Sequence, residues 1–151
     1  MDHPVSETEK KLAQAPHNLF ISSAFLFDLL MTPGAIAINI GMYGLLLPLI
    51  GSLLVVAYIY KRSRAPDQVE FVNAHWRLSF RRCQWLMAGY AVTAVLILLA
   101  WLLSLATQAA MQHILWTALT RIAILPTLVA VMVTLVMEAS AMSQASRGEA
   151  P

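Results

Sequence analysis

Residues 85–106 read WLMAGYAVTAVLILLAWLLSLA, a run of 22 residues without a charged side chain. At a rise of about 1.5 Å per residue, a helix of this length spans about 33 Å, enough to cross the bilayer core of about 30 Å. Trp85 and Trp101 lie toward its two ends, and indole rings favour the membrane interface. The run predicts a transmembrane helix and therefore an integral membrane protein.

Two more apolar runs lie on either side of it. Residues 35–60 contain no charge, and residues 114–137 contain one charged residue, Arg121. Hydrophobic residues make up 59% of the chain and charged residues 12%, whereas soluble domains are about 25% charged. A soluble fold of 151 residues has too much surface for so little charge. We therefore predict an all-α integral membrane bundle over 35–137 with three transmembrane helices.

The two ends of the chain are more polar. Residues 1–18 are predicted to be a polar N-terminal tail, and residues 138–151 a polar C-terminal tail. Between the N-terminal tail and the first span, residues 19–33 are apolar but short, contain Asp28, and run into Pro33-Gly34. This segment is interpreted as an interfacial or re-entrant helix, with a short fourth span as the alternative.

The distribution of basic residues predicts the orientation. The loop 61–84 holds six Lys or Arg against two acidic residues, and such loops stay on the cytoplasmic side. We expect this loop and the C-terminus to be cytoplasmic, the short turn 107–113 to be outside, and the membrane to be a bacterial inner membrane. Three spans place the N-terminus outside and four place it inside. Lys10 and Lys11 favour the inside.

The segment 67–83 shows helical periodicity, with apolar and basic side chains on separate stripes. It is predicted to be a basic amphipathic helix in the headgroup layer, with Trp76 and Phe80 toward lipid and Arg77 toward water. Anionic lipid headgroups or an acidic partner would contact this region, although simple anchoring of a cytoplasmic loop accounts for the same charges. The predicted contact residues are Lys61, Arg62, Arg64, Arg77, Arg81, Arg82, His75 and Trp76.

Arg121 is the charged residue within an apolar run, where an unpaired charge is costly. Asp28 and Asn39 are expected at a similar depth, so the three are predicted to form an intramembrane polar cluster. One interpretation is a polar pathway or a ligand site with Arg121 as anion anchor. The other is a structural pair between Arg121 and Asp28, or an arginine that snorkels to the outer surface.

Small residues on the spans predict close helix packing, because packing drives helix association in lipid. The candidates are Gly41, Gly44, Ser52 and Gly89. The sequence leaves open whether these faces pack within one copy of the chain or form a homo-oligomer.

No pattern of catalytic or ligand-binding residues accompanies the spans. The sequence lacks a nucleophile motif, a phosphate-binding glycine loop, paired carboxylates in the spans, and histidines or its single cysteine, Cys83, at metal-ligand spacing. We expect no enzyme, no cofactor, no metal and no nucleic-acid partner. The expected function is an interaction, accessory or assembly component of the membrane. The alternative is an oligomeric solute or ion permease with Arg121 and Asp28 in its pathway.

A family resemblance supports the same class. The motifs that carry it are Leu47-Pro48-Leu49, Tyr60-Lys61-Arg62 and the segment 71–77, FVNAHWR. Over about residues 40–106 the sequence resembles the bacterial relatives of the Tic-type chloroplast import component, which are small multi-pass membrane proteins of unknown function. The resemblance implies a helical membrane fold and no catalytic residue. The sequence departs from the family pattern at 78–81, LSFR, and at Arg121.

Overall fold

A computed structural model describes residues 5–38, 42–65, 69–106 and 108–151, which form helices and no strand. The chain divides into two compact units. The first unit comprises Met1–Cys83 and Thr134–Pro151, and the second comprises Gln84–Val133. Each unit is described separately below.

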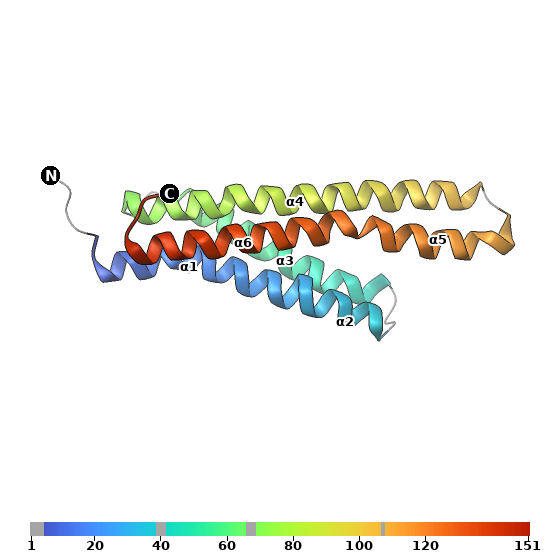
Figure 1. Ribbon diagram of the computed structural model, residues 1–151, viewed down its shortest axis with the longest axis horizontal. Coiled ribbons are helices and arrows are strands. Elements are labelled where there is room, and N and C mark those ends of the chain that lie inside the picture. The colour runs from blue at the N-terminus through green and yellow to red at the C-terminus, as the bar shows by residue number, and fades with distance from the viewer. Residues whose placement is uncertain (1–4, 39–41, 66–68, 107) are drawn as a thin grey trace. The chain divides into compact units, whose positions relative to one another are not determined.

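The first unit consists of the N-terminal helices and parts of two later helices. It contains α1 (Glu7–Ser23), η1 (Ala24–Met31), α2 (Thr32–Ala37), α3 (Met42–Ser63), the start of α4 (Glu70–Leu105) and the end of α6 (Leu125–Arg147). Figure 1 shows that the start of α1, the start of α4 and the end of α6 lie at the same end of this unit, beside the C-terminus.

The N-terminal helix is much longer than the sequence predicts. A capping box begins it, in which Ser6 Oγ accepts from the Glu9 amide at 3.2 Å and Glu9 Oε2 accepts from the Ser6 amide at 2.8 Å. The predicted tail is therefore helical from Glu7 onward. Pro33 does not end the helix, because it lies in the first turn of α2, where a missing amide hydrogen is tolerated.

Four helices in the described part of the chain are long and apolar enough to cross a membrane. They are Glu7–Ala37, Tyr43–Ser63, Glu70–Leu105 and Met111–Arg147. Glu7–Ala37 has 31 residues, about 46 Å of helix. The short segment 19–33 is thus part of a helix with membrane-spanning length, which favours the four-span alternative over an interfacial helix.

The segment 67–83 is also different from its prediction. From Glu70 it is helical, but it is the first part of α4, which continues to Leu105 as one helix of 36 residues. Trp76 is buried and its ring meets Tyr58 edge-on, with centroids 6.0 Å apart, instead of facing lipid. Arg77 is exposed, as expected.

The second unit holds the later part of α4, α5 (Ala109–Ala123) and the start of α6 (Figure 1). The break between α5 and α6 falls at Ile124, two residues before Pro126, which has no amide hydrogen to donate to the Ile122 carbonyl and whose ring clashes with that carbonyl in a continuous helix. Thr127 Oγ1 donates to Thr93 Oγ1 at 2.8 Å and joins α6 to α4. α6 then extends to Arg147, so most of the predicted C-terminal tail is helical.

Two small residues allow close packing inside the chain. A Cβ on Gly89 would lie 2.5 Å from the Ala130 Cβ. A Cβ on Gly51 would lie 2.5 Å from the ring of Phe27. Ser52 is buried as well. Gly44 is half-buried, and Gly41 is outside the described residues. These positions favour packing within one copy of the chain.

We expect Thr8→Cys and Arg64→Cys to be labelled by an impermeant thiol reagent from the same side, and Gln108→Cys from the other. All three residues are exposed, and α4 is about 54 Å long. The basic residues assign the first two to the cytoplasm. The parent protein with buried Cys83 is the control. If Thr8→Cys and Gln108→Cys were instead labelled from the same side, the three-span topology would be correct.

We expect Gly89→Val to destabilise the protein by about 1–3 kcal/mol, because the new side chain meets a Cβ that is fixed to its own backbone. The matched control is Ala88→Val on the exposed side of the same helix, with an expected cost below about 0.7 kcal/mol. Thermal unfolding of the purified proteins in detergent compares the two. Equal melting temperatures would contradict the close approach of α4 and α6.

Candidate functional site

A group of fully buried polar side chains lies at the end of the first unit where α1, α4 and α6 meet. His17 comes from α1, His75 from α4 and Glu138 from α6, and each has no exposed surface. Ionisable side chains are rarely buried unless they are paired. Each polar atom of these side chains therefore needs a partner.

The three side chains form one continuous line of contacts. Glu138 Oε2 pairs with His17 Nδ1, and His17 Nε2 lies 3.0 Å from His75 Nδ1. His75 Nε2 lies 3.1 Å from the backbone oxygen of Glu149. We call Glu138, His17, His75 and the Glu149 carbonyl the buried network. It connects α6 to α1, α1 to α4, and α4 to the C-terminal segment.

The Glu149 carbonyl fixes the direction of these hydrogen bonds. A carbonyl oxygen only accepts, so His75 Nε2 must donate. A neutral His75 then presents a bare Nδ1, which accepts from His17 Nε2. Because His17 donates through Nε2, one further proton must lie between its Nδ1 and Glu138. Three protons satisfy all three contacts, one more than a carboxylate with two neutral imidazoles carries.

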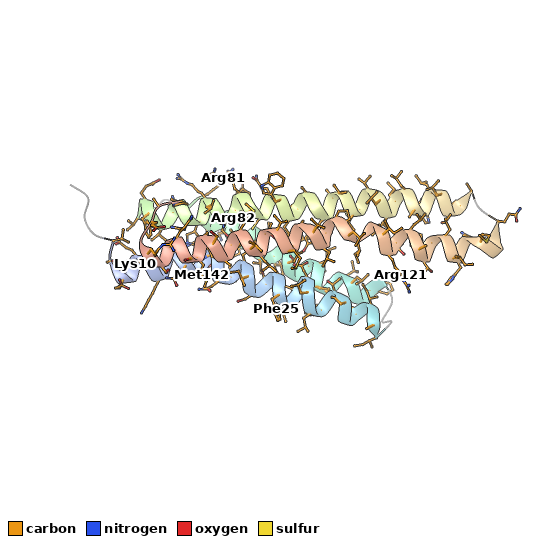
Figure 2. The ribbon with its side chains drawn as sticks, viewed as in Figure 1. Lys10, Phe25, Arg81, Arg82, Arg121 and Met142 are labelled. Atoms are coloured by element: carbon orange, nitrogen blue, oxygen red, sulfur yellow. The ribbon has the colours of Figure 1, made fainter. Side chains whose placement is uncertain are left out.

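Arg82 adds a positive charge beside the carboxylate. Its Nη1 donates to the backbone oxygen of Met137 and lies 4.0 Å from Glu138 Oε2. Figure 2 shows Arg82 between α4 and α6, whereas Arg81 points outward from α4. Among the described residues, Glu138 Oε1, Arg82 Nε and Ser79 Oγ have no hydrogen-bond partner.

The C-terminal segment that closes the network is shaped by its own local contacts. Gly148 has a φ of 74°, a left-handed conformation that suits glycine at a helix end. The Glu149 amide donates to the Gln144 oxygen at 3.1 Å. Arg147 donates to both carboxylate oxygens of Glu149, at 2.8 and 2.9 Å, and this lowers the pKa of that carboxyl. The Glu149 carbonyl is thus presented to His75 by a capped helix.

The residues of the predicted intramembrane cluster are placed separately. Asp28 lies in the π-helix η1 and accepts a hydrogen bond from Ser52 Oγ at 3.5 Å. Arg121 lies in the last turn of α5, exposed, and points away from α4 (Figure 2). Asp28 belongs to the first unit and Arg121 to the second, and their pairing stays a prediction. Asn39 is outside the described residues.

The predicted headgroup contacts divide into two groups. Most of the basic residues are exposed, and Arg62 and Arg82 are half-buried. The exposed ones are Lys61, Arg64, Arg77 and Arg81. His75 and Trp76 are buried, where His75 contacts His17 of α1 and Trp76 contacts Tyr58 of α3, and their contact with headgroups stays a prediction.

His17 and Glu138 are not among the predicted site residues, because both fall in segments that are predicted to be polar tails. One signal was available for Glu138, since it is the only acidic residue between Glu70 and Glu149 and directly follows an apolar run. His17 likewise lies just before such a run. A lone ionisable residue at the edge of a span is a candidate for a buried pair.

No group of three or more His, Cys, Asp or Glu residues suited to a metal ion occurs in the part of the chain that the structure describes. No family model, curated protein sequence or solved structure matches this chain. The resemblance to the Tic-type relatives therefore stays a prediction.

We expect Glu138→Leu to lower the free energy of unfolding by about 3–5 kcal/mol, because it leaves Arg82 and His17 buried without their carboxylate partner. The double variant Glu138→Leu with His17→Leu should recover part of this loss. Glu70→Leu, at an exposed carboxylate, is the control and should change stability by less than about 1 kcal/mol. Thermal unfolding in detergent measures all three. A Glu138→Leu protein as stable as the control would contradict the pairing.

Proposed function

We propose that this chain is a small multi-pass membrane protein that acts as an accessory or assembly component without catalytic activity. The observation that supports this most is the use of its buried ionisable groups. Glu138, His17 and His75 bind one another across three helices and leave no exposed surface. Such a network specifies one arrangement of helices, which is what a component that presents a fixed surface to a partner requires.

The surface of the same unit supports a lipid-facing role. Exposed basic residues lie at and after the end of α3 and at the start of α4, close in sequence to the network. Arg64 stacks over the Tyr60 ring at 4.5 Å. We propose that these residues contact anionic headgroups on the cytoplasmic face of a bacterial inner membrane, where each adds about 1 kcal/mol.

An apolar groove of about 490 Å³ lies between α1, α3 and α4, and its lining residue Trp76 directly precedes the exposed Arg77 in sequence. Its lining is Ala15, Leu19, Leu54, Val55, Tyr58 and Trp76. The aromatic rings of Tyr58 and Trp76 meet edge-on at this groove. An apolar groove beside basic side chains suits the acyl chain of an anionic lipid.

The apolar outer face of the second unit is the surface offered to a partner. Large side chains along α4 are about half exposed, for example Leu98 at 54% and Leu102 at 49%. Small residues that would favour tight self-association, such as Gly89, are used inside the unit instead. We therefore propose that the partner is an apolar helix of a larger membrane complex, with a second copy of the chain as the other candidate.

One observation favours the permease alternative. Asp28 lies in a π-helix of 8 residues, and π-helical segments are frequent at functional sites. Its carboxylate bonds with Ser52 from α3 inside an apolar region. An oligomer that lines a pathway with Asp28 and Arg121 would use both residues for ions or polar solutes.

We expect a photo-crosslinking amino acid at Leu98 or Leu102 to give a discrete protein adduct in intact membranes. The same probe at Leu86, which is 2% exposed, is the matched control and should give none. Adducts to lipid alone at both exposed positions would contradict the accessory role. If, in addition, vesicles with the purified protein showed ion flux that Asp28→Asn abolished, the permease would replace it.

A further inference from the structure

We propose that the buried network is a proton-binding site that holds the C-terminal segment, residues 148–151, when it is protonated and releases it when the proton leaves. The ligand is a single proton, shared between Glu138 Oε2 and His17 Nδ1. The site is independent of which partner the protein binds. It adds a pH response to the accessory or permease role.

The protonated state is the one that satisfies every contact of the network. Its three shared protons lie between Glu138 and His17, between His17 Nε2 and His75 Nδ1, and between His75 Nε2 and the Glu149 oxygen. Every facing pair of atoms then contains one donor and one acceptor. The segment is held because its carbonyl has a buried donor.

Loss of one proton forces a rearrangement along the whole line. His17 Nδ1 must keep a proton to face the carboxylate, so its Nε2 becomes bare. His75 must then place its proton on Nδ1 to donate to His17, and its Nε2 becomes bare in turn. Two protons remain where there were three, and the third has gone to solvent. The bare His75 Nε2 now faces the lone pairs of the Glu149 oxygen, and this contact is repulsive.

The position of the network suits exchange with the aqueous phase. His17 and Glu138 lie close to the ends of apolar runs, and His75 lies in the polar first part of α4. The segment that covers His75 is itself at the surface, since Ala150 and Pro151 are exposed. Release of that segment would open a path for the proton at the end of the first unit.

Other titratable groups around the network set its charge balance. From α4 these are Arg82, 4.0 Å from Glu138 Oε2, and the buried thiol of Cys83. From α1 the Lys10 side chain approaches Gly148, and from α6 Arg147 binds the Glu149 carboxylate. From α3, the charged side chains are Lys61 and Arg62 in its last turn.

The sign of the pH response follows from the proton count. At low pH the network is protonated and the segment is held. As pH rises, the proton leaves and the segment is freed. For one proton, the ratio of freed to held segment rises about tenfold per pH unit.

A substitution at Glu138 isolates this mechanism. Glu138→Gln keeps the shape of the side chain and can donate a permanent amide hydrogen to His17 Nδ1. His17 then keeps its proton on Nε2 and His75 keeps its own on Nε2. The variant therefore imitates the protonated state, and its segment should stay held at every pH.

The experiment places a spin label on Ala150→Cys of the full chain in lipid nanodiscs and measures its mobility from pH 5 to 9. The parent protein, whose one cysteine is buried, controls for labelling. We expect the label to be immobilised at low pH and mobile at high pH, with a one-proton transition. In Glu138→Gln we expect an immobilised label throughout.

A second variant separates the network from the surface ion pair. Glu149→Gln weakens the contact with Arg147 but keeps the backbone carbonyl, so the pH transition should persist. The proposal is overturned if the mobility of the label does not change with pH in the protein that carries Ala150→Cys alone. It is also overturned if Glu138→Gln titrates as that protein does, or if Glu149→Gln abolishes the transition. Intact melting temperatures confirm that each variant is folded.

Discussion

The pairing of Glu138 with His17 is the contact on which the first unit depends. It joins α6 to α1 across 121 residues of sequence, and the contact of His17 with His75 adds α4. Outside these groups the helices meet mainly through apolar side chains, which in lipid give little preference for one neighbour over another. Polar groups that must find specific partners provide that preference. The network therefore decides which helix ends meet.

Burying these groups is costly, and the surroundings of the network show how the cost is reduced. The second imidazole and a backbone carbonyl satisfy the far side of His17, and Arg82 supplies positive charge near the carboxylate. A buried ion pair of this kind contributes less to net stability than to a unique structure.

The distribution of apolar and ionisable side chains along the helices fits a membrane protein that acts by contacting a partner. The apolar parts of α3 and α4 expose large side chains, whereas the ionisable groups at the start of α4 are either buried in the network or exposed beside α3. The small residues Gly51 and Gly89 pack closely against Phe27 and Ala130 within the chain. Large apolar side chains of α3 and of the later part of α4 remain exposed, each within its own unit.

The sequence by itself determined the all-helical class and the membrane-spanning runs, because an uncharged run such as 85–106 has one stable solution in lipid, a helix that satisfies its own backbone. It did not determine the ends of the helices. Residues 7–18 and 138–147 are polar, yet they are helical because α1 and α6 bring their buried faces together. Only the tertiary structure decided that His17, His75 and Glu138 meet. Helical periodicity shows which side chains share a face of one helix, but it carries no information about which distant helix that face will contact.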